Sequence, residues 1–302
     1  MKQSFLFPDT AIPKIQAAPI VARLAAAIWT TRKAWLIRLY LQLFVYVTNR
    51  GTYIDAFAGP QKTLDAWAAR LIWEADPGPK RKRIDRFELF EISRRSLKQL
   101  KDMVSRTSEN KRTVFITDGD ANIELPKALA KRPITNPAFC LLDQRSTECS
   151  WDLVKAVALH KVEGHKIELF YFLMAGWKNR SLKNLKIDPD GDLLRWWGRD
   201  DFEIAIKADP NRLAELFCDR FRNELGYRFV QPFPIYGDPN DGSRGRLQYW
   251  MIHASDHEAA TSFMVRAFNR LACGYDPNAK QEDFGWTDAE LKAQLKPRKS
   301  VL

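Results

Sequence analysis

Thr52-Tyr53-Ile54-Asp55-Ala56-Phe57-Ala58-Gly59-Pro60-Gln61 is the stretch of sequence that decides the fold class of this chain. Its first six residues form a short apolar run typical of a strand, and the small residues after them predict a tight turn. The segments before it, residues 12–27 and 31–47, carry apolar side chains at helical spacing. The change of period therefore marks the point where a helical segment gives way to a sheet.

Downstream of this turn, short apolar runs alternate with segments of helical spacing. Strands are expected at residues 84–90, 113–117, 138–143 and 167–174, and helices at residues 94–105, 151–160 and 211–225. Two further runs, residues 227–235 and 247–254, flank a loop rich in Gly, Asp, Asn and Ser. They predict a closing pair of strands that adds one antiparallel edge strand.

This order of elements predicts an α/β fold with a doubly wound, mostly parallel, seven-stranded sheet. Strand–helix units followed by a terminal strand pair are the layout of the class I methyltransferase type. We expect residues 1–50 to form a helical N-terminal cap and residues 51–275 the sheet domain, with a helical insertion at about residues 177–209. Residues 276–302 are expected to be a C-terminal tail.

The composition is that of a globular protein with an excess of positive charge. Hydrophobic residues make up 45% and charged residues 28%, which excludes disordered and fibrous classes. The 48 basic against 37 acidic side chains leave a net charge of +11, which favours DNA or RNA as a partner. The sequence has no apolar stretch of the roughly 18–20 residues that a membrane span needs. We therefore expect no membrane partner and a cytoplasmic location.

Cysteine and histidine residues do not indicate a metal site. The four cysteines form no Cys-x-x-Cys pair, which argues against a zinc site and a disulfide framework. His253 and His257 have the spacing of a helical metal-binding pair, but their segment crosses from a strand to a helix. A structural role is the stronger interpretation for both, and no metal is expected.

Acidic residues follow each of the first four predicted strands. Because the carboxyl ends of parallel strands meet at the edge of the sheet where ligands bind, these side chains are expected around one cleft. Carboxylates gathered there are costly unless donors or cations meet them, and adenosylmethionine offers hydroxyls, an amine and a positive centre. The residues expected to bind this cofactor are Asp55, Phe57, Ala58, Gly59, Pro60, Gln61, Glu91, Asp120, Ala121 and Asn122.

Within this set, Glu91 is placed to accept hydrogen bonds from ribose hydroxyls. Asp120 and Asn122 stand where an adenine amine would be recognised. Each acidic residue taken alone is also suited to capping a helix or holding a turn, and that alternative stays open. Glu91 follows Asp55 by 36 positions, against about 20 in a compact dinucleotide fold, so a nicotinamide dehydrogenase is the poorer fit.

Asp143-Gln144-Arg145-Ser146 follows the fourth predicted strand, where methyltransferases hold the acceptor atom. Enzymes that methylate amino groups of nucleic acids carry Asp or Asn, two prolines and an aromatic residue there. Asp143 fits that pattern, whereas Gln144 and Arg145 replace the prolines, and these three are the candidate catalytic residues. Arg145 is suited to a phosphate or a carboxylate, and a surface charge pair with Glu148 is an equal alternative.

Basic side chains in other segments are expected to contact the substrate. They are Lys33, Lys178, Arg180 and Arg244. The compact basic run at residues 80–83 precedes a strand, so it is expected at the opposite edge of the sheet, away from the cleft.

Six segments are shared with one known family. They are Lys33-Ala34-Trp35-Leu36, residues 53–61, Gly119-Asp120-Ala121-Asn122, Leu142-Asp143 with Trp151, Phe170-Tyr171-Phe172-Leu173 and residues 249–257. Together they resemble the bacterial three-Cys-motif partner protein (TcmP) family, over roughly residues 32–271. The resemblance implies a Rossmann-type, adenosylmethionine-dependent methyltransferase that occurs beside a Cys-motif protein similar to radical enzymes. Many members carry Asp-Pro-aromatic-Gly after the fourth strand, from which residues 143–146 depart.

The sequence therefore predicts an adenosylmethionine-dependent methyltransferase that acts on a nucleic acid. The altered fourth-strand motif keeps one alternative open, a catalytically weak, methyltransferase-like partner of a neighbouring Cys-motif protein. A methyltransferase of small molecules is the remaining interpretation.

Overall fold

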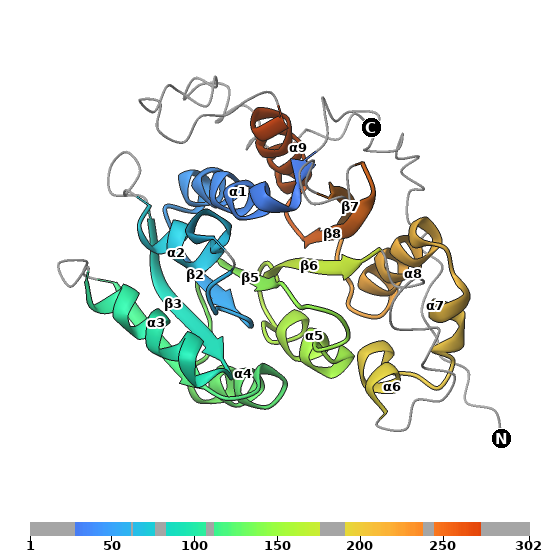
Figure 1. Ribbon diagram of the computed structural model, residues 1–302, viewed down its shortest axis with the longest axis horizontal. Helices are drawn as coiled ribbons and strands as arrows, with labels where there is room; N and C mark the ends of the chain where they lie inside the picture. The colour runs from blue at the N-terminus through green and yellow to red at the C-terminus, as the bar shows by residue number, and fades with distance from the viewer. Residues whose placement is uncertain are drawn as a thin grey trace.

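An eight-stranded sheet forms the centre of the molecule in the computed structural model (Figure 1), which describes residues 28–61, 63–75, 83–106, 112–175, 191–237 and 245–272. The strand order is β1-β7-β8-β6-β5-β2-β3-β4. The strands are β1 (Ile28–Trp29), β2 (Arg50–Asp55), β3 (Arg83–Glu91), β4 (Thr113–Asp118), β5 (Ala138–Leu142), β6 (Glu168–Met174), β7 (Phe229–Tyr236) and β8 (Leu247–Ser255). The seven predicted strands are confirmed, and the short β1 is an eighth that the sequence did not indicate.

Strand direction in the sheet is uniform except in β8. Strand β8 runs antiparallel to both of its neighbours, β6 and β7. The prediction that the antiparallel strand lies at the edge is wrong, because β8 is inserted between them. Strand β7 is the outer one of the pair and carries Pro232 and Pro234. Proline has no N–H to donate to a neighbour, so this segment suits the outside of a sheet.

Helices cover both faces of the sheet, so the fold is the expected doubly wound α/β type (Figure 1). Helices α1 (Lys33–Thr48), α2 (Ala68–Trp73), α3 (Arg94–Ser105) and α9 (Glu258–Ala272) contribute to the core on one face. Helices α4 (Ala121–Lys131), α5 (Trp151–Ala158), α6 (Asp192–Trp197), α7 (Glu203–Lys207) and α8 (Pro210–Asn223) cover the other face. Two 3-10 turns, η2 (Thr30–Arg32) and η3 (Leu64–Ala66), precede α1 and α2.

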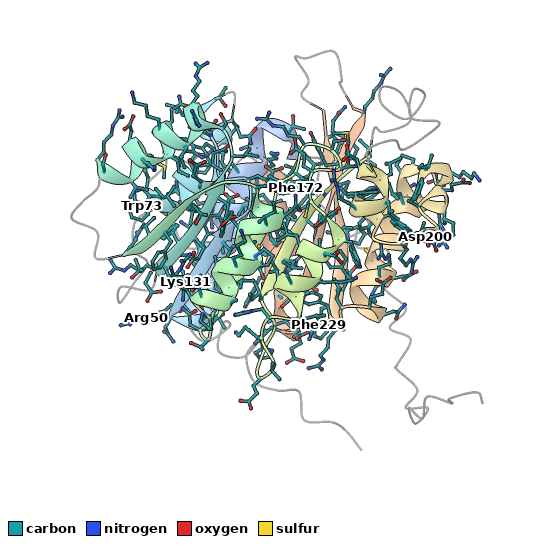
Figure 2. The ribbon with its side chains drawn as sticks, turned by 90° about the horizontal axis from the view of Figure 1, so that it is seen from below. Arg50, Trp73, Lys131, Phe172, Asp200 and Phe229 are labelled. Atoms are coloured by element: carbon teal, nitrogen blue, oxygen red, sulfur yellow. The ribbon has the colours of Figure 1, made fainter. Side chains whose placement is uncertain are left out.

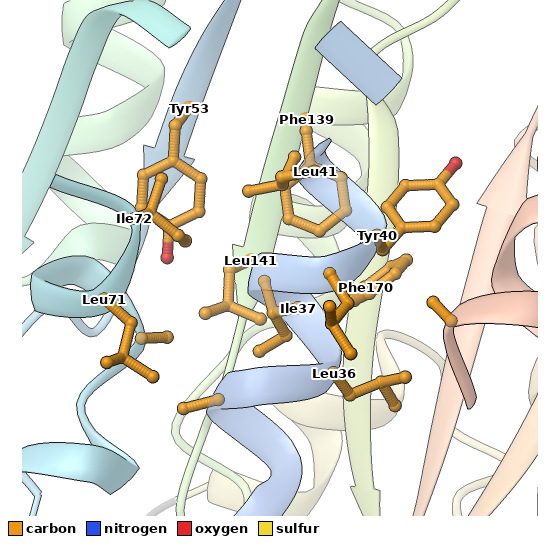
Figure 3. Close-up of a cluster of buried hydrophobic side chains, with 14 of the residues drawn as sticks. Leu36, Ile37, Tyr40, Leu41, Tyr53, Leu71, Ile72, Phe139, Leu141 and Phe170 are labelled. Carbon is orange, nitrogen blue, oxygen red and sulfur yellow. The ribbon is translucent and has the colours of Figure 1, made fainter. Parts of the chain in front are cut away.

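Alternation along each strand divides its side chains between two cores. Along β5, Phe139 and Leu141 face the core beneath α1, whereas Cys140 and Leu142 face the core beneath α5. Figure 3 shows the first of these cores, in which Ile37 of α1 lies against Leu141. A strand that is apolar on both faces is typical of a parallel sheet with helices on both sides.

The N-terminal part of the described chain is built into this core. Helix α1 buries nine apolar side chains against the sheet, and β1 pairs in parallel with the end of β7. Of the predicted insertion at residues 177–209, the structure describes residues 191–209, which contain α6 and α7. The remaining part of that insertion, the predicted helix at residues 12–27 and the C-terminal tail lie outside the described residues.

The direction of the strands separates the two edges of the sheet. Arg50 and Phe229 begin β2 and β7, and they lie along one edge, whereas Phe172 near the end of β6 lies toward the other (Figure 2). Arg83 begins β3, so it too belongs to the amino edge, as expected for the end of the basic run. The other three residues of that run lie outside the described ranges.

Candidate active site

A cleft of about 910 Å³ opens at the carboxyl edge of the sheet. It lies where β2 has β3 on one side and β5 on the other, the point at which the strand order reverses and where ligands bind in such folds. The predicted site residues that line it are Phe57, Gly59, Pro60, Gln61, Glu91, Asp120, Ala121, Asn122, Asp143 and Arg145. The fold thus gathers side chains from four strand ends into one space.

The turn after β2 brings backbone close to the carboxylate of Glu91. A Cβ atom on Gly59 would lie 1.9 Å from Glu91 Oε2, so any larger residue here would have to displace this carboxylate. The turn is held from both ends, since the Ala58 N–H donates to the Phe90 carbonyl (2.9 Å) and the Trp67 indole donates to the Ala58 carbonyl (2.7 Å). Ala58 is therefore part of the turn without lining the cleft.

Asp55 does not line the cleft, because it points into the protein beneath the same turn. Its carboxylate accepts hydrogen bonds from the Tyr53 hydroxyl (2.6 Å) and from the Phe57 N–H (3.1 Å). Burial raises the pKa of the Asp55 carboxyl to about 7, and the nearby charges of Asp143 and Glu91 act in the same direction. The Asp55 side chain therefore stabilises the turn through these two hydrogen bonds.

Asp120 and Asn122 form the opposite wall, at the start of α4. Asp120 Oδ1 accepts from both the backbone N–H and the side-chain amide of Asn122, at 2.9 Å each. The Asn122 amide also donates to the Glu148 carbonyl (2.8 Å) and accepts from the Ser150 N–H (2.8 Å). Asn122 therefore ties α4 to the loop after β5, while Asp120 Oδ2 has no hydrogen-bond partner within the described residues.

Asp143 lines the cleft from the end of β5 and forms an ion pair with Lys33. The Lys33 ammonium lies 2.7 Å from Asp143 Oδ1 and 2.6 Å from Oδ2, and the two side chains are 12% and 9% exposed. The same ammonium lies 4.9 Å from the ring centre of Phe172 and 5.4 Å from that of Tyr249. Lys33, predicted as a substrate contact, thus meets the candidate catalytic carboxylate directly.

The two residues after Asp143 have different surroundings. Gln144 is buried, and its amide donates to the Phe172 carbonyl (3.1 Å) and accepts from the Cys149 N–H (2.9 Å). These bonds give Gln144 a role in holding the loop, and it does not line the cleft. Arg145 is exposed at the cleft, and only its backbone N–H donates to Glu148 (3.2 Å). Its guanidinium has no partner among the described side chains.

Two apolar residues of the cleft were missed by sequence reasoning. Ile92 directly follows Glu91 and is 67% exposed, and Ile123 lies in the first turn of α4 and is 54% exposed. A large aliphatic side chain directly after a strand-end acidic residue is the signal that could have identified Ile92. Other lining residues outside the predicted set are Ala56, Ser93, Ser96, Gly119, Thr147, Glu148, Ser150, Asp152, Asp192 and Arg195.

Three of the predicted substrate contacts, Lys178, Arg180 and Arg244, lie outside the described residues. Within the described ranges, no group of three His, Cys, Asp or Glu side chains is arranged to hold a metal ion. His253 is buried with its Nε2 atom 3.4 Å from Glu168. None of the helices in these ranges combines the length and apolar character needed to cross a membrane.

Comparison with known proteins finds only distant likeness. No family model and no curated protein sequence matches this chain. One similar solved structure is a candidate methyltransferase from Thermobifida fusca YX. The aligned part covers 76% of this chain and 81% of that protein, at 13% identity and a TM-score of 0.41. A DUF574 family protein from Streptomyces avermitilis MA-4680 covers 75% and 83%, at 11% identity and a TM-score of 0.38. The fold assignment therefore rests on the strand order, and these comparisons do not identify the three-Cys-motif partner protein family.

Proposed function

We propose that this protein is an adenosylmethionine-dependent methyltransferase that acts on a nucleic acid. The observation that carries the proposal is the cleft at the carboxyl edge, where a glycine turn, two strand-end acidic residues and Asp143 line one space. The strand order, with an antiparallel strand inserted before the last parallel one, is that of class I methyltransferases. Fold alone does not establish activity, so the argument depends on the residues of the cleft.

The cleft offers a partner for each part of the cofactor. Glu91 would accept hydrogen bonds from the ribose hydroxyls, and the exposed Ile92 and Ile123 would contact the adenine ring. Asp120 Oδ2, which has no partner in the described part of the chain, would accept from the adenine amine. The backbone around Gly59, where a Cβ atom would not fit beneath Glu91, would lie along the methionine part.

When bound, this cofactor supplies an electrophilic methyl group on a sulfonium centre. The residues of the chain then have to hold the acceptor and take up its proton. Asp143 is the carboxylate of the cleft at the end of β5. Arg145, exposed and without a side-chain partner in the described structure, is suited to a phosphate group of the substrate. The net charge of +11 supports a polyanionic substrate.

Calorimetry with adenosylmethionine and with its demethylated product tests the cofactor. We expect one molecule bound per chain, and we expect Glu91→Gln to weaken binding about tenfold because a charged hydrogen-bond acceptor is lost. Lys207→Met, which removes an exposed charge of α7, is the control and should not change the affinity. Failure of the folded protein to bind either compound would contradict the proposal.

One observation favours the alternative of a catalytically weak partner protein. The Gln144 amide is engaged by backbone groups, and both Asp143 oxygens are engaged by Lys33. Neither side chain therefore faces an amine in the way that the Asp-Pro-Pro-aromatic motif does. A partner protein of this kind would bind the cofactor without transferring its methyl group to any nucleic acid.

A further inference from the structure

The position of Lys33 conflicts with local helix preferences. It is the first residue of α1, the first turn of that helix has no acidic residue, and Arg32 before it makes no side-chain capping bond. A cation at a helix N-terminus is disfavoured by the helix dipole. Lys33 is nevertheless almost fully buried against Asp143, so the tertiary contact outweighs the local preference. A local conflict of this kind is expected at functional positions.

The pair leaves donors and acceptors unused. A lysine ammonium has three N–H donors, and one of them donates to Asp143 Oδ1, while Oδ2 completes the ion pair. No further hydrogen-bond acceptor for this ammonium lies among the described residues, and the rings of Phe172 and Tyr249 are its other neighbours there. A carboxylate has about four lone-pair positions, so Asp143 can still accept from a ligand in the cleft.

The chemistry of this pair discriminates between acceptor groups. An exocyclic amine of a base donates two hydrogen bonds, but its lone pair is delocalised into the ring and would not accept from the ammonium of Lys33. A hydroxyl donates one hydrogen bond and accepts two. A hydroxyl that reaches Asp143 from the cleft would therefore donate to its carboxylate and accept from the ammonium paired with it.

We infer that the methyl acceptor is a hydroxyl held between Asp143 and Lys33, namely the 2′-hydroxyl of a ribonucleotide; this inference rests on the proposed function. The guanidinium of Arg145, which has no side-chain partner in the described ranges, lies two residues after Asp143 in the same cleft and is suited to the phosphate beside such a hydroxyl. The 2′-hydroxyl is also the group by which a protein distinguishes RNA from DNA.

Transfer of the methyl group to this hydroxyl conserves atoms, electrons and charge. A lone pair of the hydroxyl oxygen forms a bond to the methyl carbon of the sulfonium donor. The carbon–sulfur bond breaks, and its electron pair stays on sulfur, which becomes a neutral thioether. The hydroxyl proton passes to the Asp143 carboxylate, while Lys33 keeps its charge and holds the oxygen in place.

Binding of two oligonucleotides of the same sequence, one RNA and one DNA, tests the inference without any turnover. By fluorescence anisotropy at low salt, we expect the full chain to prefer RNA by about tenfold or more, because the hydroxyl bonds to two charged groups. Lys33→Met should lower the affinity for RNA more than that for DNA and so remove this preference. Lys127→Met, which breaks an exposed ion pair of α4, should keep it. Equal affinity of the unmodified protein for RNA and DNA overturns the inference, whether or not Lys33→Met folds.

The position of a transferred methyl group gives the second measurement. RNA is incubated with the protein and tritiated adenosylmethionine, and then hydrolysed with alkali. A 2′-O-methyl group blocks alkaline cleavage, so we expect label in dinucleotides. Label in mononucleotides means base methylation, which overturns the hydroxyl acceptor and leaves the methyltransferase proposal standing. Absence of label in both fractions overturns the acceptor assignment, and calorimetry with adenosylmethionine then decides separately whether the cofactor proposal stands.

Discussion

Gly59 shows how a single residue determines the shape of the cleft. We expect Gly59→Ala to displace the Glu91 carboxylate, because the added Cβ would lie 1.9 Å from Oε2. The Glu91 side chain can shift in the open cleft, so the cost in the free energy of unfolding should stay below the roughly 1–3 kcal/mol of overpacking in a core. Adenosylmethionine affinity, measured by calorimetry, should therefore fall more than stability does.

The control for this substitution is Gly164→Ala, at a glycine with φ of +73° and open space around its Cβ position. Gly164 lies just before β6, at the amino edge of the sheet. The Gly164→Ala protein should lose about 1–2 kcal/mol in the free energy of unfolding, because alanine is strained in the left-handed backbone conformation. Its affinity for the cofactor should not change. Equal loss of affinity in the two variants would contradict the role given to Gly59.

Asp55 makes a testable prediction about pH. Its pKa is about 7 in the folded protein against an ordinary value of 3.8, so the folded state keeps a proton that the unfolded state has already released. Raising the pH from about 4 to about 7 therefore lowers the contribution of Asp55 to the free energy of unfolding. Above pH 7 that contribution has been lost. In Asp55→Asn this contribution is absent, and the single amide oxygen retains an acceptor for one of the two donors, the Tyr53 hydroxyl or the Phe57 N–H.

The measurement is urea unfolding of both proteins between pH 4.5 and pH 8, pH values chosen to bracket the pKa of about 7. All other titrating groups are common to the two proteins, so the difference between the curves reports on Asp55. We expect Asp55→Asn to gain stability relative to the unmodified protein as the pH rises. A constant difference across the range would show that Asp55 is ionised throughout.

At the scale of elements, Asn122 connects the start of α4 with the loop after β5. We expect Asn122→Ala to lower the free energy of unfolding by about 1–2 kcal/mol, because the Ser150 N–H and the Glu148 carbonyl lose their partner. Hydrogen exchange should become faster in residues 144–150 and remain unchanged in β7. Asn122→Asp keeps the acceptor for the Ser150 N–H but sets a carboxylate oxygen against Asp120 Oδ1 and the Glu148 carbonyl, so it should not restore the stability. Unchanged exchange in the loop would argue against this connection.

At the scale of the whole molecule, the net charge of +11 and the separation of the two sheet edges predict where nucleic acid binds. We expect Arg145→Ala to flatten the dependence of log affinity for RNA on log salt by about one unit, since one phosphate contact is lost. Arg50→Ala is the matched control, because Arg50 is also exposed but begins β2 at the amino edge. Anisotropy titrations over a series of salt concentrations measure both. An equal change in the two variants would mean that the contact is not confined to the cleft.

Some features of this protein could be determined from its sequence alone, because they depend on local patterns. Alternation of apolar runs with helical spacing predicted seven of the eight strands and the doubly wound architecture. Acidic residues after strands predicted a cleft at the carboxyl edge, since parallel strands bring such positions together whatever the details of packing. Ile92 could have been identified from its position directly after a strand-end acidic residue, whereas the exposure of Ile123 in α4 has no local signature.

Tertiary structure alone decided which atoms of the predicted residues remain available to a ligand. Asp55 and Gln144 turn inward because the backbone beside them has N–H groups that need partners, and buried N–H groups are rarely left unpaired. The place of β8 between β6 and β7 could not be predicted because its pairing with β6 joins segments distant in sequence, and such pairing leaves no periodic signal. The contact between Lys33 and Asp143, which are 110 positions apart in the chain, could not be predicted for the same reason. Local sequence determines the elements and the strand ends, whereas long-range packing determines which charges face each other.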